Sequence, residues 1–235
     1  MDPRVWLQTP EYKLLAPPAD LASILTPQEL ARGSDAFILV SGKGAAGKSR
    51  LLSRIEALFP KALRIRGEAS TRPLRPGERL GRDVVPYSSA DFEAAIAEGT
   101  HFLWAFEVPC RNKRAAFQIA AVRAAIDDFH QTGQRTLITS AAPVYFVLLH
   151  FFPGTRLIVV TTTPEDMRAN QQDRGLDPSD NATQNDYGIT SPGFEIRGAQ
   201  MVVNRRDQPG SFARTDQLAR TLYRWISGST KKSAP

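Results

Sequence analysis

The stretch that most constrains the fold is LVSGKGAAGKSR, at residues 39–50. It fits the pattern G-x-x-x-x-G-K-[ST], with Gly42, Gly47, Lys48 and Ser49 in the four fixed positions. The apolar run AFILV before it is typical of a strand covered on both faces, and KSRLLSRIEALF after it has apolar residues at helical spacing. A strand, a glycine loop and a helix in this order predict a loop that binds the phosphates of a nucleoside triphosphate.

The residues of this loop have separate expected roles. Glycines let the backbone curl so that its N–H groups converge on phosphate oxygens, and the helix that starts at Lys48 adds its positive end. We expect Lys48 to bridge the β and γ phosphates and to act in catalysis, and the Ser49 hydroxyl to hold a metal ion. The expected cofactors are ATP and Mg²⁺. The cofactor-binding residues expected in the loop are Gly42, Lys43, Gly44, Ala45, Ala46, Gly47, Lys48 and Ser49.

The motif by itself leaves several activities open. Kinases, motors, GTPases and sulfotransferases all use such a loop, and the donor could be ATP or GTP. The net charge of +6 indicates an anionic partner. Because Lys and Arg are scattered rather than gathered in one run, a phosphorylated small molecule is favoured at least as much as nucleic acid.

Composition sets the general class. A chain of 235 residues with 42% apolar and 23% charged residues suits one globular α/β domain. No apolar run reaches the roughly 18 residues of a membrane span, and the first residues lack the apolar core of a signal peptide, so we expect a cytoplasmic protein with no membrane partner. The single cysteine, Cys110, cannot form an internal disulfide, and with three histidines no metal-ligand cluster is expected.

The rest of the chain alternates between strand and helix patterns. Such alternation predicts a parallel sheet with helices on both faces. Thr26 and Glu29 predict a capped short helix in TPQELARG. Further strands are expected at 136–139, at 156–163 and in AQMVVN, and further helices at 113–131, about 142–151, 164–172 and 214–226.

An arginine-rich segment, RIRGEASTRPLRPGERLGRD, follows the first helix. It is punctuated by Pro and Gly and is too irregular for a helix. A solvated surface loop is one interpretation, but guanidinium groups are also the best geometry for holding a phosphate in two hydrogen bonds. A second anion site close to a triphosphate site suggests a donor and an acceptor. The arginines are Arg64, Arg66, Arg72, Arg75, Arg79 and Arg82.

This segment and the one after it resemble guanylate kinase. In that family a T-R-x-x-R-x-G-E stretch precedes a helix and a strand containing Trp-Ala, and here STRPLRPGERLGRD precedes SSADFEAAIAEGTHFLWAFEV. The resemblance runs from about residue 36 to 226 and includes G-Q-R-T-L-I-T, then D-R-G at 173–175, and V-V-N at 202–204. It implies the fold of the nucleoside monophosphate kinases, a P-loop core with an acceptor-binding arm and a lid.

The resemblance also implies a division of the chain. The domain would span 35–228, with the acceptor-binding arm at about 66–110 and a mobile lid at about 168–196. Residues 1–34 would be an N-terminal extension of unreadable role, and 229–235 a flexible tail.

Functional residues follow from the resemblance one at a time. Arg72 and Arg75 match the pair that grips the phosphate of the acceptor, and Glu78 matches the glutamate beside it. In the lid, Arg174 matches a catalytic arginine, and Arg168 lies about one turn earlier and is a second candidate. Asn204 is expected near the base of the donor.

The groups expected around a guanine base are changed. Glu68 stands where the family has a serine, Val84 where it has a tyrosine, and Leu103 where it has a glutamate. Val and Leu leave a guanine edge unpaired, and a site that cannot pair a buried polar group rejects that ligand strongly. We therefore expect an acceptor that carries a phosphate and is not GMP. The family of ribose 1,5-bisphosphate phosphokinase shares this loss of base recognition.

Catalytic positions are changed too. TSAA at 139–142 replaces an aspartate-bearing strand end, and the later lid arginine aligns with Asn185. Glu107 and Asp83 are candidates for the lost carboxylate. Three functions stay open: a kinase for a phosphate-bearing small molecule, which is favoured; a kinase for a nucleotide within DNA or RNA; and a binding module that has lost turnover.

Overall fold

The computed structural model describes most of the chain. The described residues are 13–16, 24–42, 44–108, 112–140, 144–173, 175, 199–208 and 211–228. Within this part of the chain, no helix has the length and apolar character that crossing a membrane requires.

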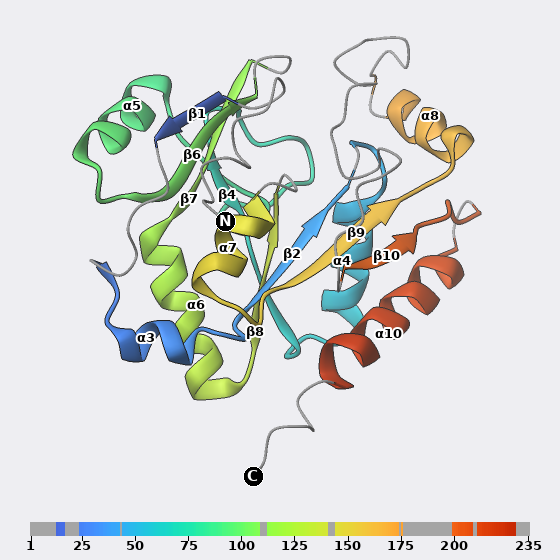
Figure 1. Cartoon of the computed structure of the whole chain (residues 1–235). Helices are drawn as coiled ribbons and strands as arrows, with labels where there is room; N and C mark the ends of the chain where they lie inside the picture. The colour runs from blue at the N-terminus through green and yellow to red at the C-terminus, as the bar shows by residue number, and fades with distance from the viewer. Residues whose placement is uncertain are drawn as a thin grey trace.

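A five-stranded parallel sheet forms the core (Figure 1). Its order is β10-β9-β2-β8-β3, so the strand that leads into the glycine loop, β2, is central. All five residues of β2 are buried, which explains its uninterrupted apolar run. The strands are β2 (Phe37–Ser41), β3 (Leu63–Arg66), β8 (Arg135–Thr139), β9 (Arg156–Thr161) and β10 (Gln200–Val203).

Helices cover both faces of the core sheet, as predicted (Figure 1). Successive side chains of a strand point to opposite faces. Ile38 and Val40 of β2 pack with the helices of one face, whereas Phe37 and Leu39 pack with those of the other. The first face holds α4 (Lys48–Leu58) and α10 (Ala213–Gly228), and the second holds α6 (Ile119–Thr132) and α7 (Val144–Phe151).

A second sheet, with its own helix α5 (Ser89–Glu98), follows the core sheet, and we call it the arm. It includes residues 13–16 and 113–118, which lie outside the bounds of 66–110 expected for an acceptor-binding arm. Its order is β1-β6-β7-β4-β5. Only Gly67 separates β3 from β4, so the arm continues directly from the edge of the core sheet. A Cβ on Gly67 would lie 2.4 Å from the backbone nitrogen of Val84, so only glycine fits at this junction. The strands are β1 (Lys13–Ala16), β4 (Glu68–Ser70), β5 (Val84–Pro86), β6 (Phe102–Val108) and β7 (Lys113–Gln118).

The N-terminal extension contributes to both parts of the molecule. Strand β1 pairs antiparallel with β6 at the edge of the arm sheet. Helix α3 (Pro27–Arg32) begins after Thr26, whose hydroxyl accepts a hydrogen bond from the backbone N–H of Glu29 at 3.2 Å. The Glu29 carboxylate in turn accepts one from the Thr26 backbone N–H at 2.7 Å, which completes the predicted cap.

One helix prediction was wrong at its start. The expected helix at 113–131 begins at Ile119, and the six residues before it form strand β7. Ala115, Ala116 and Phe117 are fully buried there, because β7 pairs with β6 on one side and β4 on the other. Alanine favours helices locally, but sheet pairing decides the structure of this segment. The remaining expected strands and helices of the core are present with ends shifted by a residue or two.

Candidate active site

The glycine loop joins β2 to α4 at the carboxyl edge of the core sheet. Gly42 has φ +132°, and a Cβ there would lie 2.0 Å from the carbonyl oxygen of Val160 on β9. Gly47 has φ +82°, and a Cβ there would lie 2.3 Å from the side-chain nitrogen of Asn204. Both glycines are therefore required by backbone conformation and by space. Ala45 also has positive φ, at 60°, so the loop holds an unusual backbone.

Lys48 and Ser49 begin helix α4 and lie at its positive end. The Lys48 ammonium donates a hydrogen bond to the Gly42 carbonyl at 2.5 Å, so the side chain reaches across the whole loop. The Ser49 side chain is exposed. Their arrangement matches the expected donor set of an ammonium and a hydroxyl next to a helix N-terminus. Lys43 lies outside the described residues.

Two asparagines that lie outside the glycine loop donate hydrogen bonds to its backbone. Asn170, on helix α8 (Pro164–Gln172), donates from Nδ2 to the Ala45 carbonyl at 2.9 Å. Asn204, directly after β10, donates from Nδ2 to the Ala46 carbonyl at 3.0 Å. Asn204 is buried, and among the described residues its Oδ1 has no hydrogen-bond partner. The structure thus gives Asn204 a place behind the loop, and direct contact with the donor base stays a prediction.

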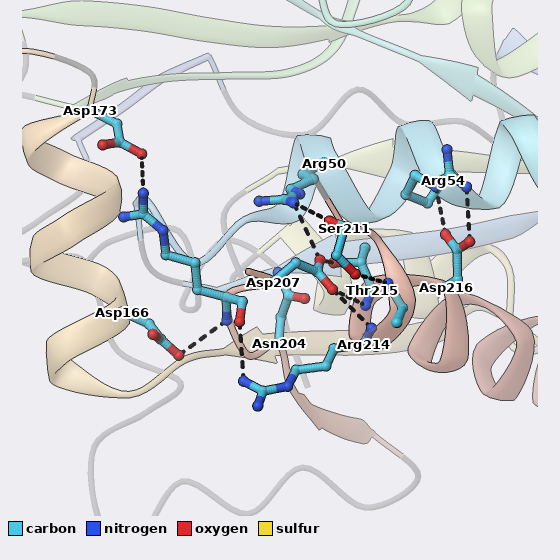
Figure 2. Close-up of polar contacts among 12 residues, drawn as sticks. Arg50, Arg54, Asp166, Asp173, Asn204, Asp207, Ser211, Arg214, Thr215 and Asp216 are labelled. Carbon is cyan, nitrogen blue, oxygen red and sulfur yellow. Dashed lines mark hydrogen bonds and ion pairs between the residues drawn. The ribbon is translucent and has the colours of Figure 1, made fainter. Parts of the chain in front are cut away.

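The segment after Asn204 ties α8 to the core (Figure 2). The Arg206 backbone N–H donates to Asp166 at 3.1 Å, and its guanidinium donates to Asp173 at 2.8 Å. Asp166 and Asp173 lie near the two ends of α8, so one arginine spans the helix that also carries Asn170. Because Asn170 of α8 also bonds the glycine loop, the positions of α8 and of the glycine loop are coupled.

The same segment is fixed to α4 by Asp207 (Figure 2). The Asp207 carboxylate accepts a hydrogen bond from the Arg214 backbone N–H at 2.8 Å and lies 3.3 Å from the guanidinium of Arg50. Burial alone would raise the pKa of Asp207, but hydrogen bonds from Thr215 and Arg214 and the charge of Arg50 outweigh burial and lower the pKa. Asp207 therefore stays ionised and holds the start of α10 against α4.

The lid residues are described in part. Arg168 is exposed on α8 and lies 3.8 Å from Glu165, one turn away. Arg174 lies outside the described residues, as do all residues from 176 to 198. The catalytic roles of Arg168 and Arg174 and the lid at 168–196 stay predictions.

The arm brings the three expected phosphate-binding residues together. Arg72 donates two parallel hydrogen bonds to the Glu78 carboxylate, at 2.6 and 2.8 Å. The Arg75 backbone N–H donates to the same carboxylate at 2.9 Å. Burial alone would raise the pKa of Glu78, but the hydrogen bonds from Arg72 and Arg75 outweigh burial, so the pKa is lowered. Glu78 is thus an ionised anchor that fixes the guanidinium of Arg72.

A further carboxylate, Glu68, stands at one of the positions expected around a base. It begins strand β4, and the Ser140 hydroxyl donates a hydrogen bond to its Oε1. Ser140 directly follows β8, and its backbone N–H donates to the Val40 carbonyl at 3.2 Å. Burial raises the pKa of Glu68 to about 7, although Lys113, Ser140 and Arg72 all act to lower it. The sequence has no acidic residue directly at the end of β8, but Glu68 of the arm places a carboxylate there.

The two carboxylates proposed from sequence have other partners. Asp83 accepts hydrogen bonds from the Arg82 guanidinium and, at 2.9 Å, from the Arg79 backbone N–H. Glu107 lies 4.0 Å from Lys13 across the pair of β1 and β6. Neither contacts the end of β8 in the bonds that the structure shows.

The apolar replacements in the arm are core residues. Val84 is 2% exposed, and Leu103 is fully buried in the cluster that joins the arm to α6. Their side chains offer no hydrogen bond to a ligand. Of the three changed positions, Glu68 is the one that keeps a polar group.

Comparison with known proteins agrees with this architecture. No family model matches the sequence. Over 69 residues the chain is 43% identical to a guanylate kinase of Rubrobacter xylanophilus and 38% identical to one of Gloeobacter violaceus. The match is 29% of this chain but only 36% and 33% of those relatives, so the chain matches about a third of their length.

A solved structure is similar over most of the chain. The crystal structure of guanylate kinase from Anaplasma phagocytophilum superposes with a TM-score of 0.53 and 16% identity. The match covers 85% of this chain and 89% of that one. The comparisons confirm the resemblance to guanylate kinases and the α/β fold of a P-loop kinase.

Proposed function

We propose that this chain is an ATP-dependent kinase that transfers the γ-phosphate to a small molecule that already carries a phosphate. The observation that carries the proposal is the loop from Gly42 to Ser49, with Lys48 reaching across it at the start of α4. The local likeness to guanylate kinases supports the same reaction class.

The residues of the loop fit a magnesium-bound triphosphate. Backbone N–H groups at the start of α4 and the Lys48 ammonium are suited to the phosphates, and the Ser49 hydroxyl is suited to the metal ion. Magnesium, when bound, would neutralise charge that develops on the transferring phosphoryl group. Such a site depends little on protein carboxylates, because Mg²⁺ keeps several waters and binds the phosphates of the substrate. Among the described residues, no group of three His, Cys, Asp or Glu could hold a metal alone.

The acceptor would bind on the arm. Arg72 is oriented by Glu78, and Arg75 lies in the same loop, so the two can hold a phosphate with charge-assisted hydrogen bonds. Since β4 continues from β3 through Gly67, this grip is attached directly to the sheet that carries the triphosphate loop. Arg168 and Arg174 would add positive charge at the transferring group and help to exclude water. With Val84 and Leu103 buried in the core, we propose that GMP is not the acceptor.

The test is transfer of labelled phosphate from ATP to GMP, AMP, ribose 5-phosphate and a 5′-phosphorylated oligonucleotide, followed by identification of the product. Wild type should label at least one small acceptor, and Lys48→Ala should label none. Turnover of GMP at about 1 to 100 per second, the range of kinases, would contradict the proposed acceptor class. Transfer to the oligonucleotide alone would favour a nucleic-acid kinase. ATP binding without transfer to any acceptor would favour a binding module.

The arm arginines have a separate test. Arg72→Ala and Arg75→Ala should each weaken acceptor binding by about 1.5 to 3 kcal/mol, the scale of hydrogen bonds to charged groups, with little change in ATP affinity. Arg79→Ala is the matched control, because Arg79 lies in the same segment but pairs with Glu56 of α4. If Arg72→Ala lowers only the stability of the fold, Arg72 is a structural partner of Glu78 and nothing more.

A further inference from the structure

Glu68 lies where the two sheets of the molecule meet. It is the first residue of β4, one residue after the end of β3. Its carboxylate accepts a hydrogen bond from Ser140 at the end of β8, and Ser140 is bonded in turn to Val40. Val40 is two residues before Gly42, where the triphosphate loop begins. The carboxylate is therefore placed between the strand that leads to the donor site and the arm that would hold the acceptor.

Two positive side chains act on this carboxylate. Arg72 is four residues further along the chain and is fixed by Glu78, and Lys113 begins the neighbouring strand β7. Both favour the ionised form of Glu68, as does the hydrogen bond from Ser140, yet burial outweighs them and raises its pKa to about 7. The charged form is thus under-stabilised by the protein alone, and a ligand that donates a hydrogen bond to it would restore the balance.

We propose that Glu68 selects the acceptor: beside the phosphate held by Arg72 and Arg75, its carboxylate accepts a hydrogen bond from an O–H or N–H group of the acceptor. This inference rests on the proposed function and narrows it. An ionised carboxylate can only accept hydrogen bonds. A ligand that presents a carbonyl or a second phosphate oxygen at this place is repelled, and a ligand that presents a hydroxyl or an amino group is held.

Three probes separate these chemistries. AMP carries an amino group on the six-membered ring of its purine, 6-methoxypurine riboside 5′-monophosphate carries an ether oxygen at the same position and no N–H group on the ring, and ribose 5-phosphate offers only hydroxyl groups. GMP is unsuitable as the acceptor-only probe, because its N1–H and 2-amino groups can also donate to a carboxylate. Binding of each to the full chain, measured by calorimetry in the presence of magnesium and a non-hydrolysable ATP analogue, should favour AMP or ribose 5-phosphate over the methoxy nucleotide by about tenfold or more near pH 8. The AMP and ribose 5-phosphate arms tell an amino donor from a hydroxyl donor. Equal or tighter binding of the methoxy nucleotide would overturn the inference.

Variants assign that preference to Glu68. Glu68→Ser and Glu68→Gln each replace the acceptor-only carboxylate by a group that can also donate, so both should reduce the preference to within about threefold. Glu93→Gln is the matched control, because Glu93 lies on the arm with an exposed side chain paired to Arg114. It should keep the wild-type preference. A preference that persists in both Glu68 variants would assign selection to another residue.

A pH series adds a readout that a purely structural role would not move. Between about pH 8 and pH 6, Glu68 of the wild type gains a proton, and the neutral acid both donates and accepts. The ratio of affinities for the donor probe and the methoxy nucleotide should therefore shrink at pH 6 in wild type and stay flat in Glu68→Gln. An equal change in both proteins would contradict the inference. Because these are binding measurements, a preference that follows Glu68 would stand even if no acceptor were phosphorylated, whereas phosphate transfer without that preference would leave the kinase standing and remove the role of Glu68.

Discussion

The raised pKa of Glu68 leads to a prediction about stability that can be tested without ATP or an acceptor. Its pKa is raised from the ordinary 4.5 to about 7, because burial disfavours the charged form. Between these two values the folded protein holds a proton that the unfolded chain has released, so the free energy of unfolding falls as the pH rises through this window. At about 1.36 kcal/mol for each pKa unit, the full penalty above pH 7 is about 3 kcal/mol.

Replacing Glu68 by Gln should remove this penalty. The amide oxygen of Gln can still accept the hydrogen bond from Ser140, so the contact between arm and core is kept. Since the Glu68 side chain is only partly shielded from water, we expect about 1 to 2 kcal/mol rather than the full value. The difference in free energy of unfolding between Glu68→Gln and wild type should therefore shift in favour of Glu68→Gln by this amount as the pH rises from about 5 to about 8.

Urea unfolding of both proteins at these two pH values measures the effect, and subtraction cancels every other group that titrates. Ser140→Ala is the informative companion, because it removes a donor that favours the charged form and should steepen the loss of stability with rising pH. If Glu68→Gln is destabilised by the same amount at both pH values, the carboxylate is not strained in the folded state, and the reasoning fails.

Four further changes test the glycine loop and the residues that support it. Lys48→Ala should lower phosphate transfer by at least about a hundredfold in the labelled-ATP assay, with the free energy of unfolding changed by less than about 0.5 kcal/mol. Asn204→Ala should lower the free energy of unfolding in urea by about 1 to 3 kcal/mol, because it removes a buried hydrogen bond to the loop. Asn170→Ala should lower it less, but should also weaken ATP binding, which calorimetry measures. Asp207→Asn should destabilise the fold near neutral pH, and the difference should shrink as the pH falls below about 3.8, where wild type also loses the charge whose lowered pKa stabilises it.

The core of the fold was predictable because its signals are local. The apolar run of β2 and the amphipathic pattern of α4 lie on either side of the glycine loop, and each identifies its own structure. The one clear error is the segment Lys113–Gln118, which was expected to begin a helix. It forms strand β7, which lies between β6 and α6 in the sequence. Its residues favour a helix locally, and they form a strand because two other strands pair with them, which a helical pattern within one segment cannot reveal.

The shape of the glycine loop was predictable for a related reason, because phosphate binding, its proposed function, would depend on backbone shape, and that shape requires glycine at two fixed places. The residues that hold the loop were harder to find. Asn170 lies on α8, 125 residues from the carbonyl that it binds, and nothing in its own segment distinguishes it from a surface asparagine. Long-range polar contacts of this kind carry no sequence period.

Glu68 and Ser140 are two departures from the family pattern that contact each other in the structure. In the sequence, the first is a carboxylate where the family has a serine, and the second is a serine-containing strand end where the family has an aspartate. They are 72 residues apart, yet the structure places them in hydrogen-bond contact. The arm therefore brings a carboxylate to the end of β8, the strand that pairs with β2 next to the glycine loop. If the arm holds the acceptor as proposed, a negative charge on it would change which acceptor groups can bind. Acceptor choice would then depend on the protonation of one residue, Glu68, whose pKa of about 7 lies near neutral pH.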